Sequence, residues 1–151
     1  MSDMASIQPV KNEQRPRDAD QKVITGACLC GTVSFEVTAP LPKGDACHCA
    51  QCRRWSGHFF ASVDVKRTAL TVQHDKSLSW YQSSEKVRRG FCQHCGSSLF
   101  FDPVDRQKHD WIGVALGAFD SATQTELEMH IFVEEQGDYY TLNDGVKQNR
   151  R

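Results

Sequence analysis

The stretches CLCG at residues 28–31, CHCAQC at residues 47–52 and CQHC at residues 92–95 contain all seven cysteines of the chain. Thiolates gathered this densely are ligands for a soft metal ion, and zinc is the ion that proteins most often hold in this way. Seven cysteines divide into four plus three. Four ligands complete a closed tetrahedral site, whereas three leave one position open, which a catalytic zinc needs and a structural zinc lacks.

The cysteines are expected to be metal ligands rather than disulfide partners. The start of the chain has no basic segment followed by an apolar one, so we expect no secretory signal. The protein is therefore expected to be cytoplasmic, where thiols are kept reduced. An odd number of cysteines also fits a disulfide framework poorly.

Composition and charge exclude several classes of function. The chain has 151 residues, 39% of them hydrophobic and 25% charged, which is typical of one ordinary soluble domain. It contains no apolar run long enough to cross a membrane. The formal net charge is −1 and no basic stripe stands out, so nucleic acid is not an expected partner.

The pattern of apolar residues predicts an all-β domain. Residues 1–20 are polar and of mixed charge, which indicates a flexible N-terminal tail and leaves residues 21–151 as a single domain. Residues 32–38 alternate with period two, as a half-buried strand does. Further strands are expected at 59–65, 70–72, 78–81, 87–91, 98–101, 111–116 and 129–133. Residues 51–56 leave room for one helical turn and no more, so few or no helices are expected.

The first and third clusters are suited to one shared site. Two residues separate Cys92 from Cys95, so both sulfurs can face one ion, and Gly96 then permits the positive φ of a tight turn. The pair Cys28 and Cys30 has the same logic with one spacer residue. Together the two pairs would supply four sulfurs and join two distant hairpins, contributing on the order of 10 kcal/mol to folding.

The middle cluster has a different character. Cys47, Cys49 and Cys52 lie within six residues, so one loop can place three sulfurs around one ion. No fourth protein ligand is evident. His48 is flanked by two of the cysteines and is sterically poorly placed, so we expect it, like His94, to be a surface residue or a neighbour of the ligands.

Two basic stretches adjoin the cysteines, at residues 53–54 and 86–89. Most such residues form solvated surface. An arginine placed beside metal-bound thiolates would instead offset their charge and lower the thiol pKa.

The order of these motifs resembles the glutathione-dependent formaldehyde-activating enzyme family, also called the GFA domain family. The resemblance runs from about residue 22 to about residue 145 and includes all seven cysteines, each in its motif. It implies a small zinc-stabilised β-tent of stacked antiparallel sheets. It also implies two zinc ions, a structural one held by Cys28, Cys30, Cys92 and Cys95 and a catalytic one held by Cys47, Cys49 and Cys52.

The activity implied by the resemblance is that of a carbon–sulfur lyase. The family reaction joins formaldehyde to glutathione to give S-hydroxymethylglutathione, with the glutathione thiol at the open zinc position. Arg53, Trp55, Ser56 and His58 follow the middle cluster and could line a pocket for an acidic thiol, although we expect Trp55 to be a packing residue and His58 a surface residue.

Two other functions remain open at this point. The chain could be a non-catalytic zinc-binding module that binds a protein partner, in which case the middle site would be closed by a fourth ligand or left empty. It could also be a redox protein with a metal-free middle cluster. Edge strands of such a domain also allow pairing into a homodimer.

Overall fold

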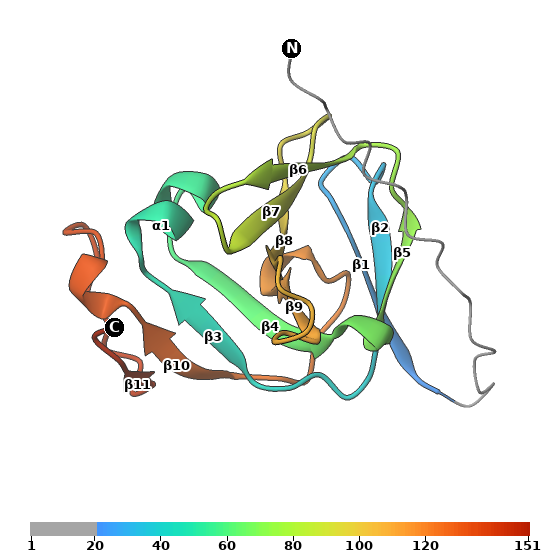
Figure 1. The fold of residues 1–151 in the computed structure, drawn as a ribbon. Helices are drawn as coiled ribbons and strands as arrows, with labels where there is room; N and C mark the ends of the chain where they lie inside the picture. The colour runs from blue at the N-terminus through green and yellow to red at the C-terminus, as the bar shows by residue number, and fades with distance from the viewer. Residues whose placement is uncertain (1–20) are drawn as a thin grey trace, which may run out of the picture.

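A computed structural model of the chain describes residues 21–151, which form two β-sheets (Figure 1). The smaller sheet has the order β1-β2-β5, with β1 at Val23–Ala27, β2 at Ser34–Thr38 and β5 at Leu70–His74. The larger sheet has the order β11-β10-β3-β4-β9-β8-β7-β6. Its strands are β3 (Gly44–Cys47), β4 (Phe60–Lys66), β6 (Leu78–Gln82), β7 (Val87–Cys92), β8 (Ser98–Pro103), β9 (Trp111–Ala115), β10 (Leu127–Ile131) and β11 (Lys147–Gln148). The expected all-β class is confirmed.

Most neighbouring strands pair antiparallel, as expected for this fold. The exceptions are at one end of the larger sheet, where β10 runs parallel to both β3 and β11. Each expected strand overlaps an observed one. Three observed strands, β1, β3 and β11, were not predicted. The tail expected at residues 1–20 lies outside the described residues.

The described chain contains one α-helix, α1 (Ala50–Ser56), and three short 3₁₀ helices, η1 (Arg67–Ala69), η2 (Leu116–Ala118) and η3 (Val133–Glu135). With seven residues α1 makes about two turns, so the expectation of a single turn was too short. It ends at Gly57, whose φ of 84° gives a left-handed cap that few other residues adopt. Within residues 21–151, no helix has the length and apolar character needed to span a bilayer.

The main hydrophobic core lies between the two sheets. Phe35 of β2 is buried and its ring meets Phe100 of β8 at 5.4 Å and Phe119 at 5.5 Å, both edge to face. Buried valines of β2, β4 and β9 surround these rings. Cys28 and Cys92 belong to the same cluster, so the core fixes the ends of the two hairpins that carry the first and third cysteine clusters.

Candidate metal centres

Four cysteine sulfurs from the two hairpins converge on one point. The Sγ atoms of Cys28, Cys30, Cys92 and Cys95 all lie within 4.8 Å of one another. The Sγ of Cys30 is 3.6 Å from that of Cys28 and 3.8 Å from that of Cys92. A tetrahedral zinc with bonds of about 2.3 Å requires its sulfurs about 3.8 Å apart, so the group has dimensions that fit the ion.

Backbone hydrogen bonds hold the turns that carry these sulfurs. The turn after Cys92 closes with the Gly96 amide donating to the Cys92 carbonyl at 2.8 Å, and Gly96 has the positive φ of 80° that its position predicts. The Val33 amide donates to the Cys28 sulfur at 3.3 Å. The Leu29 amide donates to the Ser97 hydroxyl at 2.9 Å, which joins the two turns directly. The first centre is therefore built by local backbone geometry on both hairpins.

The second group comes from one continuous segment. Cys47 ends β3, Cys49 is the N-cap of α1, and Cys52 lies within the first turn of that helix. The Cys52 amide donates to the Cys49 sulfur at 3.4 Å, so Cys49 caps the helix with its thiol. All three Sγ atoms lie within 4.8 Å of one another. No histidine, aspartate or glutamate of residues 21–151 joins this group as a fourth ligand.

Hydrogen bonds among the three thiols concentrate negative charge on one sulfur. Hydrogen bonds from Cys47 and then Cys52 lower the pKa of Cys49 to about 2. The same contacts, together with burial, raise the pKa of Cys47. The protein alone therefore stabilises the first thiolate and opposes further ones. A bound cation would relieve this repulsion, so the donor set suits a metal ion.

Arg89 brings a positive charge to this group. Most residues of its stretch were expected at the solvated surface, with an arginine beside the thiolates as the alternative; only 4% of Arg89 is exposed, which fits the alternative. Its Nη1 is 3.5 Å from the Cys52 sulfur, and its guanidinium lies 5.0 Å from the ring of Trp55. Arg89 is buried because it lies on the face of β7 that packs toward α1, where aromatic rings cover it and the Cys52 sulfur accepts its hydrogen bond.

Of the two positions expected for His48, at the surface or beside the ligands, the structure fits the second, because the residue is fully buried. Its Nε2 lies 2.8 Å from Nδ1 of His130, and its Nδ1 contacts the hydroxyl of Tyr140. Nε2 of His130 in turn lies 2.9 Å from a carboxylate oxygen of Asp144. Burial, followed by the proximity of His130, lowers the pKa of His48 to about 4. Both ring nitrogens are engaged, so His48 supports the cysteine loop rather than offering a ligand.

The C-terminal segment packs against the cysteine loop and α1, as Figure 1 shows for the chain that follows β10. Glu135 accepts hydrogen bonds at 2.9 Å from the Ala50 amide, through its carboxylate, and from Arg53 Nε, through its carbonyl. His58, expected at the surface, is half-buried and lies 2.8 Å from the Tyr139 hydroxyl. Glu135 and Tyr139 were not predicted as partners, because each lies more than 80 residues along the chain from the residue that it contacts.

The remaining residues near the clusters follow their expectations. Trp55 is half-buried and packs on Phe60, with ring centroids 4.8 Å apart. His94 is exposed beside the first centre.

Fold and sites together define a small two-sheet β-protein with two cysteine groups, each of which could bind a metal ion. The chain belongs to the glutathione-dependent formaldehyde-activating enzyme family, whose pattern it matches over residues 23–135. It is 25% identical over 115 residues to an uncharacterised lyase from Schizosaccharomyces pombe, covering 76% of this chain and 82% of that protein. It is 32% identical over 90 residues to a putative glutathione-dependent formaldehyde-activating enzyme from Halomonas elongata, covering 54% of this chain and 57% of that protein.

The fold also recurs in a solved structure. The crystal structure of a Rhodobacter sphaeroides protein superposes with a TM-score of 0.54 at 22% identity, covering 69% of this chain and 99% of that one. At this level of identity the likeness concerns the fold alone.

Proposed function

We propose that this protein is a zinc-dependent carbon–sulfur lyase that acts on the adduct of a small thiol, such as glutathione, and an aldehyde, such as formaldehyde. The observation that carries the proposal is the three-cysteine group. It offers three sulfurs within 4.8 Å of one another and has no fourth ligand from residues 21–151. A metal ion held there keeps one position for a substrate. The names of the two relatives support the same class of reaction.

In this proposal the two groups have different roles. The four-cysteine group is closed and holds a structural zinc that joins the hairpins. The three-cysteine group holds the catalytic zinc, with Cys47, Cys49 and Cys52 as its ligands. The proposed location is the cytoplasm, where glutathione is abundant as the reduced thiol and the cysteines stay reduced.

A zinc ion in the second group would stabilise the substrate thiol as a thiolate near neutral pH. In the forward direction the thiolate sulfur attacks the carbonyl carbon of the aldehyde. A carbon–sulfur bond forms, the carbonyl π electrons move to oxygen, and that oxygen takes up the proton that the thiol has lost. Cleavage of the adduct reverses each change.

The chain's own residues supply position and charge for this chemistry. Arg89 donates to the Cys52 sulfur and offsets the negative charge of three thiolates. His48 is held neutral between two partners and fixes the loop between Cys47 and Cys49. Glu135 fixes the start of α1 through the Ala50 amide.

The test compares the metal-loaded wild type with Cys49→Ser in forming the adduct of glutathione and formaldehyde. Exchange NMR of labelled formaldehyde measures the rate of adduct formation, and the uncatalysed rate is subtracted. The wild type should accelerate the exchange and Cys49→Ser should lose at least tenfold of that acceleration. A protein that gives no acceleration above the uncatalysed rate contradicts the proposal.

A second measurement separates the enzyme from a non-catalytic binding module of the same fold. With cobalt in place of zinc, the absorption of the second centre should change when glutathione is added, because a new sulfur enters its open position. An unchanged cobalt spectrum together with a flat assay favours the binding module.

A further inference from the structure

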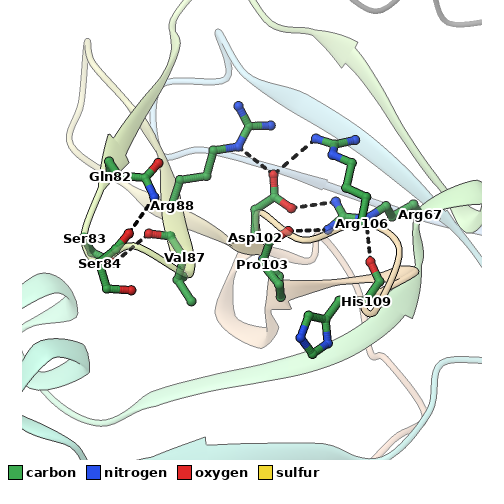
Figure 2. A network of polar contacts seen from close by, with 10 residues as sticks. All are labelled: Arg67, Gln82, Ser83, Ser84, Val87, Arg88, Asp102, Pro103, Arg106 and His109. Carbon is green, nitrogen blue, oxygen red and sulfur yellow. Dashed lines mark hydrogen bonds and ion pairs between the residues drawn. The ribbon is translucent and has the colours of Figure 1, made fainter.

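A second concentration of charge lies away from the cysteines, around the carboxylate of Asp102 in β8 (Figure 2). The Asp102 side chain is 2% exposed, accepts hydrogen bonds from Arg67 and Arg88, and forms an ion pair with Arg106. Its Oδ1 lies 2.6 Å from Arg67 Nη1, and its Oδ2 lies 2.7 Å from Arg88 Nε and 3.5 Å from Arg106 Nη2. One negative charge therefore faces three positive ones, and both carboxylate oxygens are already engaged.

The three arginines are not used to the same extent. Arg67 uses all three of its side-chain nitrogens, because it also donates to the carbonyl of Pro103 at 2.8 Å and to that of His109 at 3.2 Å. Arg88 uses only Nε in the network, and neither of its terminal nitrogens has a partner among the described residues. Arg106 makes one long contact, and its side chain is 52% exposed. Figure 2 shows both guanidinium groups beside the same carboxylate oxygen.

The free donors of Arg88 are held in place before any ligand arrives. The guanidinium carbon of Arg88 lies 4.1 Å from the ring centre of Trp80, so stacking on one side and Asp102 on the other restrict it. The three arginines and Asp102 line a cavity of about 160 Å³, together with Leu70, Trp80 and Ile112. A pocket of this size has room for a small group such as an oxyanion.

We propose that Arg88 and Arg106 bind a small oxyanion of the phosphate class in this cavity. Guanidinium groups bind phosphate oxygens through paired N–H donors, which Arg88 still has free. Two surplus positive charges also match the charge of about −1.5 to −2 that a phosphate monoester carries at pH 7. Both free phosphate and the phosphate group of a larger molecule have this chemistry.

The proposed oxyanion site is separate from the second cysteine group. Successive residues of a strand point to opposite faces, and β7 carries both Arg88 and Arg89. Arg89 turns toward Cys52, whereas Arg88 turns toward Asp102. The site therefore does not depend on the function proposed for the cysteines.

Titration calorimetry of the metal-loaded protein with inorganic phosphate tests the proposal. Wild type should bind one phosphate saturably, and Arg88→Gln and Arg106→Gln should each weaken binding at least tenfold. Arg150→Gln is the matched control, because it removes the same charge from an exposed arginine at the far end of the chain, and it should bind like wild type. Arg106→Gln leaves Asp102 paired with two arginines, so it provides the test even if Arg88→Gln fails to fold.

Two results would overturn the site. The first is the absence of saturable binding, or equal binding in wild type and both arginine variants. Either result would mean that the arginines serve only to neutralise the buried charge of Asp102. The second is binding that survives Arg88→Gln but disappears in Cys49→Ser, which would assign the phosphate to the metal centre. Parallel titration with glycerol phosphate separates the two sources. Tighter binding of glycerol phosphate indicates the phosphate group of a larger molecule, and equal binding indicates free phosphate; tighter binding of acetate contradicts the phosphate class.

Discussion

The guanidinium of Arg89 carries a positive charge into the protein interior, beside sulfurs that would be negatively charged as metal ligands. Ser83 and Gln51 also accept its hydrogen bonds, at 3.0 and 3.3 Å, so its position is fixed from three sides. A buried arginine of this kind is costly without a partner. The thiolates of the second centre are the partner that offsets its charge, and the effect should be mutual.

Substitution of Arg89 should therefore weaken the second centre selectively. We expect Arg89→Gln to lower the affinity of the three-cysteine group for zinc by about 10–100-fold, as loss of a hydrogen bond to a metal ligand does elsewhere. Competition with a coloured chelator measures this affinity. Arg54→Gln is the control, because it removes the same charge from an exposed site on α1. Equal losses in both variants would show that only general charge matters.

The contact between His48 and His130 leads to a second prediction, which concerns stability. His48 is fully buried, so replacing its partner leaves a ring nitrogen without a hydrogen bond. We expect His130→Phe to reduce the free energy of unfolding by about 1–3 kcal/mol. Urea denaturation with both metal centres loaded provides the measurement. Asp144→Asn should cost less, since Asp144 is half exposed, and a larger loss there would place the important contact at Asp144 instead.

The cysteines lie in two hairpin turns and in the loop that leads into α1. We expect the turns and the loop to contribute differently to folding. The turns at residues 28–31 and 92–96 follow β1 of one sheet and β7 of the other, and a metal ion held by their four sulfurs would connect the two sheets. The second group involves a single segment, residues 47–52, and joins no separate elements through its sulfurs. Loss of a ligand should therefore have unequal consequences for folding.

This difference predicts the behaviour of two matched substitutions. Cys92→Ser should unfold the domain, because zinc in a structural site contributes about 10–16 kcal/mol and a typical domain has only about 5–15 kcal/mol of stability. Cys49→Ser should keep its β-sheet circular dichroism and lose metal from the second centre alone. Circular dichroism with metal counting tests both. An unfolded Cys49→Ser beside a folded Cys92→Ser would reverse the roles of the two groups.

The strands that the sequence predicts are those with their own local signal. The β4 and β7 segments have alternating or β-branched residues and were placed within a residue or two. By contrast, β3 has the sequence GDAC, with low strand propensity, and exists because β4 and β10 pair with it on both sides. Gly26 interrupts the apolar pattern of β1, so this strand has no local signal. The glycine is needed there because a Cβ atom at this position would lie 2.6 Å from the carbonyl oxygen of Ala118.

The candidate sites divide in the same way. Cysteine spacing alone grouped the seven sulfurs as the structure does, since the turns that position them are local. The environment of Arg89 and the partners of His48 depend on strands and loops far along the chain, and no local pattern reports on them. The local hint of His130 is a histidine within the otherwise apolar strand expected at 129–133.

At the scale of the whole molecule, the hydrophobic core and the two centres support different parts of the fold. Phe35 and its neighbours hold the sheets together in the middle, and a metal ion in the four-cysteine group would close them at one end. The second group belongs to a smaller apolar cluster, in which Cys52 is buried together with Phe60 and Ala115. Metal in the first group should therefore be needed for the fold as a whole, whereas metal in the second should be needed only for its own loop.

Stepwise removal of metal should reveal this hierarchy. Native mass spectrometry of the purified protein is expected to show two zinc ions per chain. A mild chelator should remove the one held by three ligands first, since its open position admits a competing ligand, and circular dichroism should change little at that stage. Removal of the second ion should coincide with cooperative loss of β-structure, because four sulfurs then stop joining the sheets. If both ions leave together, the two centres do not differ in stability as this hierarchy requires. If the sheets persist without either ion, the core alone holds the molecule and the four-cysteine group has no structural role.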